Sequence, residues 1–479
     1  MSVIIQDLET VVAAAEAASP AVARATDEER AGWLEAIADA LDAAADELVP
    51  IAVAETHLPQ ARLTGEVART TGQLRLFAEV VRDGAYLEAV IDHARPDATP
   101  PQPDLRRLLV PLGPVAVYSA SNFPFAFSVA GGDTASALAV GCPVVVKAHS
   151  GHVELSRRTA EIVTGALAEA GAPEGTFGLV EGFDAGRALV QHPAIKAAAF
   201  TGSLHGGRAL FDLASGRPAP IPFYAELGSI NPVVITRQAI AASGDQLAAG
   251  LVGSFTLGAG QFCTKPGVVL VPAGTGFESV VAAAAAGASP APLLNQRIED
   301  GFHTGLQALL GHGAVEVIAR QPDQGPDAPG PTVLATDASA VLADPDTLLA
   351  ECFGPVTLLI RCADEQECFS VLRTLEGSLT ATVHAAEGED VAELATTLAA
   401  IAGRVLFGGW PTGVAVTWSQ QHGGPWPATT SIHTSVGASA ARRFQRPLVF
   451  QDAPESVLPA ALREANPLGI PRRVDGRLV

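Results

Sequence analysis

The stretch Val144-Val145-Val146-Lys147 decides the fold, because three β-branched residues followed by a lysine are typical of a short buried strand that ends at a sheet edge. Short β-rich runs of the same kind lie on both sides of it, at 115–118, 177–180 and 197–200. Helical windows at 128–140 and 153–170 separate these runs. Strands that alternate with helices predict a parallel sheet buried on both faces. The expected fold is therefore α/β, of the dinucleotide-binding type.

The length of the chain predicts more than one domain. Its 479 residues exceed the roughly 250–300 at which a single hydrophobic core stops growing. Residues 8–92 predict helices, since apolar residues recur there every three or four positions, and Thr26-Asp27-Glu28-Glu29 resembles a helix-opening cap. A second set of candidate strands follows Glu226, at 233–236, 268–271, 356–360 and 381–384.

Charge and hydropathy argue against two classes of partner. The formal net charge of −21 disfavours binding to nucleic acid and to anionic membranes. The apolar run 280–288 is mostly alanine and is stopped by Pro290, well short of the roughly 20 apolar residues that a membrane span requires. Asp7 and Glu9 stand where a signal peptide would carry basic residues, so we expect a cytoplasmic protein.

The cysteines predict reduced thiols. Five of them are scattered along the chain, at 142, 263, 352, 362 and 368. An odd, scattered set does not resemble a disulfide framework. Because there is no Cys-x-x-Cys motif and no pair of histidines with zinc-site spacing, no metal site is predicted.

Motifs that carry reactive or polar residues follow one another along the chain. They are Ser121-Asn122-Phe123-Pro124, Phe200-Thr201-Gly202-Ser203, Glu226-Leu227-Gly228, Gly260-Gln261-Phe262-Cys263 and Glu351-Cys352-Phe353-Gly354-Pro355. In this order, and over nearly the whole chain, they resemble the NAD(P)-dependent aldehyde dehydrogenase superfamily. Stretches at 70–75, 130–138, 206–211 and 422–425 are similar to its branch of 2,5-dioxovalerate (α-ketoglutarate semialdehyde) dehydrogenases and a related NADP-dependent fatty aldehyde dehydrogenase.

The resemblance implies a catalytic set of three residues. Cys263 would attack the aldehyde carbon as a thiolate, giving a thiohemiacetal and then a thioester. Asn122 and the backbone N–H of Cys263 would donate to the oxyanion. Glu226 would activate the water that hydrolyses the thioester, so the product would be a carboxylic acid. Each residue also has a structural alternative: a buried core cysteine, an asparagine that caps a turn, and a glutamate that caps a loop or pairs with an arginine.

The resemblance also implies how a nicotinamide cofactor is held. Lys147, at the carboxyl edge of the sheet, would bind a ribose hydroxyl. Gly202 and Ser203 would offer backbone N–H groups to the pyrophosphate at the start of a helix, although a Gly-Ser pair is ordinarily a helix cap. Glu351 and Phe353 resemble the pair that holds the nicotinamide ribose and ring.

The sequence gives a partial indication of the choice between NAD and NADP. Ser150 stands where NAD-preferring relatives often carry a glutamate that would repel a 2′-phosphate. Ser150 can donate to a phosphate and Arg208 can pair with it, which favours NADP while allowing NAD. Arg208 is alternatively an exposed helix residue.

The chain departs from the branch pattern at two positions. Lys265 stands two residues after Cys263 where relatives usually carry Asn, and Gly408 replaces an expected Asn. Lys265 could lower the pKa of the thiol, attract a substrate carboxylate or point to solvent. Arg75 is the other candidate for holding a substrate carboxylate.

The resemblance implies an architecture and a reaction. We expect a Rossmann-type nucleotide-binding domain at 1–92 and 114–226, an α/β catalytic domain at 227–432, an oligomerisation arm at 93–113 and 433–453, and a tail at 454–479. Pairing of the arm would give a homodimer or homotetramer. The expected reaction is the oxidation of 2,5-dioxovalerate to 2-oxoglutarate.

Three alternatives stay open. The first is a medium-chain or long-chain (fatty) aldehyde dehydrogenase, and the second is a non-catalytic protein that keeps the fold. The third is a thiol hydrolase, which would need a histidine base near Cys263 that the sequence does not identify.

Overall fold

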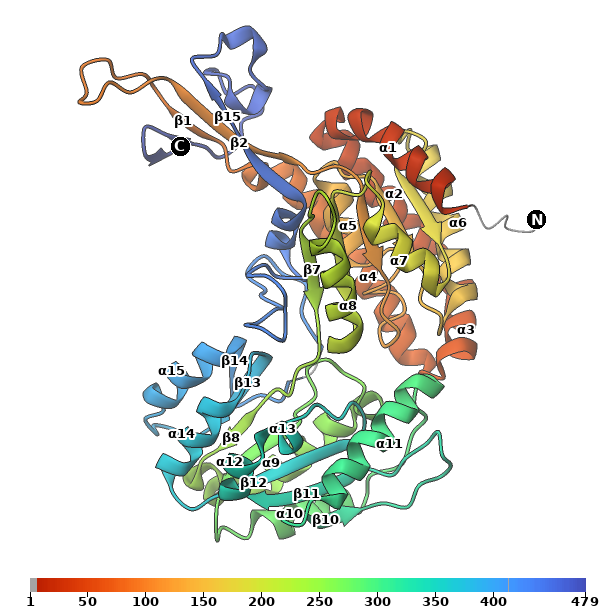
Figure 1. The fold of residues 1–479 in the computed structure, drawn as a ribbon, viewed down its shortest axis with the longest axis vertical. Helices are drawn as coiled ribbons and strands as arrows, with labels where there is room; N and C mark the ends of the chain where they lie inside the picture. Colours follow the sequence, from red (N-terminus) through yellow and green to blue (C-terminus); the bar gives the residue numbers. More distant parts are fainter. Residues whose placement is uncertain (1–6, 412) are drawn as a thin grey trace.

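The computed structural model describes residues 7–411 and 413–479. Residues 1–6 and 412, which belong to the ranges assigned above to the nucleotide-binding and catalytic domains, lie outside the described part. Three β-sheets organise two large bodies and a projecting arm (Figure 1). The chain passes from the first body to the second directly after strand β7 (Phe223–Glu226). Within the described residues, no helix combines the length and the apolar character needed to cross a membrane.

The first sheet is parallel throughout, with the strand order β5-β4-β3-β6-β7. Besides β7, its strands are β3 (Val115–Tyr118), β4 (Val144–Lys147), β5 (Phe177–Val180) and β6 (Ala197–Thr201). Val144 and Val146 pack into one hydrophobic cluster, whereas Val145 packs into another. All three side chains are fully buried. The predicted parallel sheet with two covered faces is therefore confirmed.

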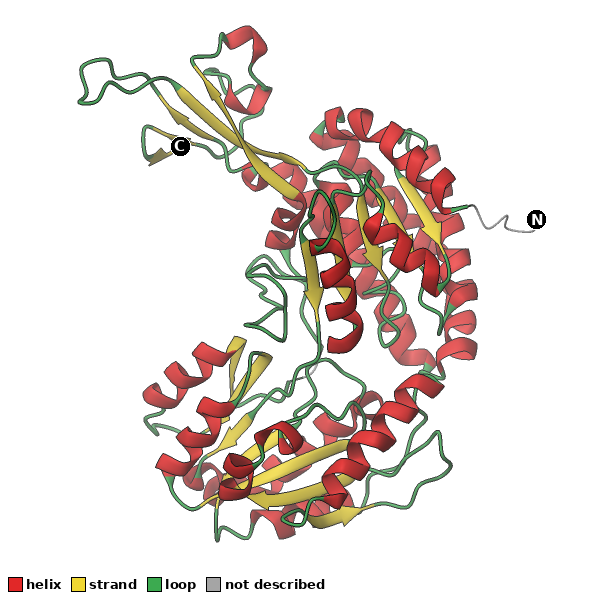
Figure 2. Cartoon of the chain, in the orientation of Figure 1, coloured by secondary structure: helices red, strands yellow, loops and turns green. Residues whose placement is uncertain are grey.

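Helices cover both faces of this sheet (Figure 2). They are α1 (Leu8–Arg24), α2 (Asp27–Ala43), α3 (Ala45–Thr56), α4 (Gln60–Asp83), α5 (Gly132–Ala139), α6 (Val153–Glu169), α7 (Phe183–Gln191) and α8 (Leu204–Ser215). Helix α2 begins at the predicted cap, because the Thr26 side chain accepts from the Glu29 N–H and the Glu29 side chain accepts from the Thr26 N–H. The expected helical entry region is confirmed.

The second sheet has the order β10-β11-β12-β9-β8-β13-β14, and only the edge strand β10 runs antiparallel to its neighbour. Its strands are β8 (Val233–Ile235), β9 (Val268–Pro272), β10 (Glu316–Arg320), β11 (Thr332–Asp337), β12 (Val356–Cys362), β13 (Ser378–His384) and β14 (Ala402–Phe407). Its helices are α9 (Arg237–Thr256), α10 (Phe277–Ala285), α11 (Gln296–Gly311), α12 (Ala338–Ala343), α13 (Pro345–Leu348), α14 (Glu365–Thr374) and α15 (Ala392–Ile401).

The arm is a third sheet, with the order β15-β2-β1-β16-β17. Its strands are β1 (Val90–Asp92), β2 (Leu105–Pro111), β15 (Gln445–Gln451), β16 (Arg473–Val474) and β17 (Arg477–Leu478). Strands β1, β16 and β17 lie outside the ranges 93–113 and 433–453, because strands of two or three residues leave no period-2 pattern in the sequence. The domain boundaries themselves remain predictions.

Short 3-10 helices complete the described structure. They are η1 (Ala85–Leu87), η2 (Leu257–Gly260), η3 (Ala438–Phe444), η4 (Glu455–Val457) and η5 (Ala460–Leu462).

Candidate active site

A left-handed turn presents Cys263 at the end of α9 and η2. Gly258, Ala259 and Gly260 have φ values of 58°, 56° and 70°. A Cβ on Gly260 would lie 2.1 Å from the carbonyl oxygen of Gly354, so the two backbones touch only because residue 260 is glycine. This contact brings the motif that ends at Cys263 against the motif that begins at Glu351.

Cys263 lies beside a histidine and a carboxylate from two other parts of the chain. The Cys263 Sγ is 3.5 Å from the Nε2 of His422, which in turn is 2.9 Å from the Oε1 of Glu226. Ser435 Oγ donates to the other Glu226 oxygen at 2.6 Å. Glu226 ends β7, and His422 and Ser435 lie in the irregular segment between β14 and η3. The side chains of His422 and Glu226 are 0% and 1% exposed, so water does not separate them.

The surroundings of Cys263 and Glu226 shift the pKa values of these two residues in opposite directions. Burial and the neighbouring Glu226 carboxylate raise the pKa of the Cys263 thiol well above its usual value, and Arg69 and Arg404 oppose this rise. Burial also acts to raise the pKa of Glu226, but the charge and hydrogen bond of His422 and the hydrogen bond from Ser435 outweigh it, so that pKa lies below its usual value. Glu226 is therefore an ionised carboxylate next to a protonated thiol.

These groups can carry proton-transfer and covalent chemistry. A buried carboxylate that is already ionised can accept a proton from a thiol or from water, and a thiolate can form a covalent bond with a carbonyl carbon. The reactive atoms of Glu226, Cys263 and His422 also lie within 4.8 Å of one another, close enough to share a metal ion, so a metal-free site stays a prediction.

Asn122 is fixed to the loop that carries Cys263. Its Nδ2 donates to the carbonyl of Gln261 at 3.0 Å, and Arg62 Nη2 donates to the backbone carbonyl of Asn122 at 2.5 Å. A side-chain amide has two N–H bonds, so one remains for an oxyanion near Cys263. The geometry is compatible with the predicted donor role.

The predicted cofactor residues lie at one edge of the first sheet. Lys147 ends β4, and Gly202 and Ser203 link β6 to α8. Ser203 caps α8 by accepting from the Gly206 N–H at 3.3 Å, and the first turn of this helix opens at the carboxyl edge of the sheet. A lysine and a helix start at the ends of β4 and β6, the two strands that flank β3, fit a nucleotide with its pyrophosphate.

Ser150 and Arg208 are not brought together. Ser150 is exposed after β4. Arg208 lies along α8, where its Nε donates to Asp212 at 2.9 Å and its Cζ lies 5.8 Å from the ring centroid of Trp426. No contact between Ser150 and Arg208 is found in the described part of the chain. The alternative of Arg208 as an exposed helix residue therefore has the stronger support.

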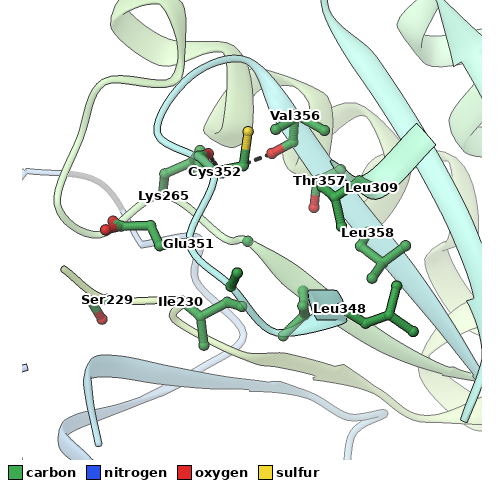
Figure 3. A pocket seen from close by; sticks show the side chains of 13 residues that line it. Ser229, Ile230, Lys265, Leu309, Leu348, Glu351, Cys352, Val356, Thr357 and Leu358 are labelled. Carbon is green, nitrogen blue, oxygen red and sulfur yellow. Dashed lines mark hydrogen bonds between the residues drawn. The ribbon is translucent and has the colours of Figure 1, made fainter. Parts of the chain in front are cut away.

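Lys265 does not face the thiol or a substrate. Its Nζ donates to the carbonyls of Cys352 at 3.0 Å and Val356 at 2.8 Å, and the residue is only 3% exposed. Figure 3 shows the pocket around this lysine, with the bond to Val356 dashed and Glu351 on the same loop. Lys265 thus fastens both ends of the 352–356 loop, which carries Phe353 and directly follows Glu351. The alternative that it points to solvent is wrong, because the residue is buried. A role toward the thiol or a substrate carboxylate has no support, because two carbonyls hold its ammonium group and Lys265 is not among the charges that act on Cys263.

Glu351 lies against the Glu226-Leu227-Gly228 motif. Its Oε2 is 2.3 Å from the position that a Cβ on Gly228 would take. A Cβ at 228 would therefore displace this carboxylate from its position. The loop with Glu351 and half-buried Phe353 therefore borders the motif of Glu226 and the motif of Cys263. This position agrees with the predicted role of the two residues in holding the nicotinamide ribose and ring.

Arg75 and Gly408 both have local structural roles. Arg75 pairs with Asp39 at 2.6 Å and Asp42 at 2.8 Å on the exposed side of α4, so it is not the carboxylate-binding residue. Gly408 has φ 71°, a left-handed conformation that Asn also tolerates better than most residues. The replacement of Asn by Gly therefore keeps the turn after β14.

His422 belongs to the site, although no sequence pattern indicated it. It lies 159 residues after Cys263 in an irregular segment, and its motif His422-Gly423-Gly424-Pro425 served only as a branch resemblance. Arg69 and Arg404, whose charges act on Cys263, were also missed. No periodicity or spacing in a single sequence links such distant segments.

Comparisons with known proteins agree on one family. The profile of the Aldehyde dehydrogenase family matches residues 5–425. The chain is 50% identical to alpha-ketoglutaric semialdehyde dehydrogenase 2 of Azospirillum brasilense, over 94% of this chain and 87% of the relative. It is 44% identical to alpha-ketoglutaric semialdehyde dehydrogenase of Acinetobacter baylyi, over 98% of this chain and 92% of the relative.

Solved structures share the fold. An NADP dependent enzyme of E. coli superposes with a TM-score of 0.79 at 22% identity, over 93% of this chain and 89% of that chain. A 1-pyrroline-5-carboxylate dehydrogenase from Thermus with bound NAD also gives a TM-score of 0.79, at 24% identity over 93% of this chain and 85% of that chain. The family profile and the two relatives, together with the ordered motifs and the cysteine site, lead to one conclusion: the chain belongs to the aldehyde dehydrogenase family.

Proposed function

We propose that this enzyme oxidises 2,5-dioxovalerate, the semialdehyde of 2-oxoglutarate, to 2-oxoglutarate. The observation that carries the proposal is the convergence of Cys263, His422 and Glu226 next to the Asn122 loop. Two relatives at 50% and 44% identity are named as enzymes for this semialdehyde. A nicotinamide cofactor fits the sheet edge at Lys147 and Ser203.

The proposed reaction begins with loss of the Cys263 proton. Glu226 accepts this proton, and the sulfur forms a bond to the aldehyde carbon. The aldehyde oxygen becomes an oxyanion that accepts from the free Asn122 N–H and the Cys263 N–H. The bound cofactor supplies an acceptor for the hydride that leaves this carbon. A thioester on Cys263 remains.

Hydrolysis then releases the acid. Glu226 first passes the proton that it took from Cys263 to solvent, and it then takes a proton from water, so that the resulting hydroxide adds to the thioester carbon. The carbon–sulfur bond breaks, the acid leaves, and the Cys263 thiolate takes the proton from Glu226, which restores the thiol and the ionised carboxylate. Because Ser435 and His422 hold both carboxylate oxygens, Glu226 keeps one orientation during the step.

We propose NADP as the preferred cofactor. Ser150 offers a hydroxyl instead of a carboxylate, so a 2′-phosphate meets no like charge there. Arg208 does not support this preference, because Asp212 already pairs with it. In Ser150→Glu the ratio of kcat/KM for NADP over NAD should fall, and an unchanged ratio contradicts this assignment.

The function is tested by reduced-cofactor formation with 2,5-dioxovalerate and with pentanal, a neutral aldehyde of the same chain length. Wild type should prefer the semialdehyde in kcat/KM. Cys263→Ala should lose turnover, whereas Cys368→Ala, which changes another half-buried cysteine, should keep it. A preference for pentanal rejects the substrate, and turnover by Cys263→Ala rejects the nucleophile.

The thiol hydrolase alternative is not favoured by the position of His422. Its Nε2 lies beside both Cys263 and Glu226, and the ionised Glu226 carboxylate can only accept a hydrogen bond. The Nε2 therefore carries the proton and is not available as a base for the thiol.

A further inference from the structure

Arg69 reaches the reactive cluster from α4 with part of its guanidinium unused. Its Nε donates to the carbonyl of Val414 at 3.2 Å, and its Cζ lies 5.2 Å from the ring centroid of Phe127. The Phe127 ring is 6.2 Å from the ring of His422, which contacts Cys263. Arg69 Nη1 is buried and has no hydrogen-bond partner. A buried donor without a partner has a marked free-energy cost unless a ligand satisfies it.

Arg404 reaches the same cluster from β14. It pairs in register with Thr380 of β13, and Thr380 donates from both N and Oγ1 to Asn231 Oδ1. Asn231 Nδ2 donates to the carbonyl of Cys263 at 2.8 Å. Since cross-strand partners project from the same face of a sheet, Arg404 shares the face that holds Cys263. Its Nε is buried and has no hydrogen-bond partner.

Neither arginine has an acidic partner of its own. Within residues 7–411 and 413–479, no salt bridge involves Arg69 or Arg404. Glu66, the acidic residue of α4 whose charge acts on Arg69, accepts instead from the backbone N–H groups of Phe125 and Ala126 at 2.9 and 3.0 Å. Burial lowers the pKa of both arginines, and the proximity of Cys263 opposes the shift in each, with Glu226 adding to the opposition at Arg69. Both arginines therefore lie near Cys263 without a direct ion-pair partner among the described residues.

We propose that Arg69 and Arg404 bind the carboxylate at the end of the substrate remote from the aldehyde. The inference rests on the proposed function and names its specificity residues. Guanidinium groups pair with carboxylates through parallel N–H donors. With the aldehyde carbon on Cys263, a carboxylate four bonds away would come near the two arginines whose charges act on the sulfur. The site therefore selects short aldehydes that end in a carboxylate over neutral aldehydes of equal length.

The test compares kcat/KM for 2,5-dioxovalerate and for pentanal in Arg69→Met and Arg404→Met. The ratio of the two values should fall roughly tenfold to hundredfold in each variant, because each removes a charge-assisted bond that only the acid makes. Arg69→Lys and Arg404→Lys, which keep the charge, should recover part of the ratio. Arg75→Met, which removes an arginine on the outer side of α4, should keep the wild-type ratio.

The outcomes separate the two proposals. If wild type does not prefer 2,5-dioxovalerate, the proposed function fails. If wild type prefers it and the Met variants keep the ratio, only the arginine assignment fails. An equal loss with both aldehydes also overturns the assignment, since the arginines would then act on the thiolate or on the fold. Calorimetric binding of 2-oxoglutarate to Cys263→Ala provides a second readout, and it should weaken at least tenfold when either arginine is changed to Met.

Discussion

At the scale of single residues, the site couples a protonated thiol to an ionised carboxylate. The Cys263 pKa lies above its usual value of 9.0, whereas the pKa of Glu226 lies below its usual 4.5. Because the thiol pKa is raised, little of Cys263 is thiolate near neutral pH, and the thiolate fraction grows as the pH rises. Arg69 and Arg404 act in the opposite direction and keep that fraction from falling further.

The first prediction concerns the pH dependence of Cys263 reactivity. The rate of alkylation by iodoacetamide, followed by intact mass, should rise with pH up to about 9 without a plateau. In Glu226→Gln the rise should begin at lower pH, because the carboxylate that raises the thiol pKa is gone. A rate that is flat across the alkaline range in the wild type would contradict the assigned charges.

Motif order predicted Cys263, Glu226 and Asn122, because each motif holds its residue at a fixed place in the chain. The same reasoning missed His422, and it named Lys265 and Arg75 as candidates for a substrate carboxylate, although both have other partners in the structure. Lys265 was close to Cys263 in sequence, but its side chain turns into the 352–356 loop. Which side of a loop a side chain faces depends on tertiary packing, which a single sequence does not contain.

At the scale of elements, the turn before Cys263 joins two loops backbone to backbone. Gly260→Ala would place a Cβ 2.1 Å from the Gly354 carbonyl in a left-handed conformation, so the loops must separate. We expect a loss of about 2–4 kcal/mol in the free energy of unfolding, together with most of the activity.

A matched control lies in the same segment. Gly253 is in α9, and no atom lies within 4 Å of the position that a Cβ would take there, so Gly253→Ala should stabilise the protein by about 0.5–1 kcal/mol. Urea unfolding and aldehyde turnover measure both variants. Equal stability of Gly260→Ala and wild type would refute the backbone contact as a requirement.

The elements themselves were predictable to different degrees. Strands β3 to β6 were expected because their apolar runs are separated by helical windows. The turn at 258–260 was not, since Ala259 gives no sign of its positive φ. Local composition thus predicts buried strands well. It does not predict the conformation of the irregular segments that form the active site.

At the scale of the whole molecule, the arm presents apolar side chains at its edges. Val449 of β15 is 50% exposed and Leu478 of β17 is 72% exposed. Both belong to edge strands, which tend to recruit a further strand or a partner subunit. We therefore keep the prediction of a homodimer or homotetramer built through the arm.

Light scattering coupled to gel filtration tests this prediction. The wild type should give twice or four times the chain mass of 48.9 kDa. Val449→Lys should shift the distribution toward smaller species, because it places a charge on the edge strand. Val317→Lys, which places the same charge on β10 at the edge of the second sheet, should not. A wild-type mass of one chain would contradict the arm as an interface.

The covalent route through Cys263 is tested most directly by a burst measurement on Glu226→Gln. Mixed with oxidised cofactor and 2,5-dioxovalerate, this variant should form about one equivalent of reduced cofactor per site and then nearly stop. The Cys263 thiol can still lose its proton to solvent, because the carboxylate that raises its pKa is gone, whereas hydrolysis lacks its base. Intact mass should then find the acyl group on Cys263. Continued turnover at the wild-type rate, with no acyl group on the protein, would contradict the thioester and the role of Glu226 together.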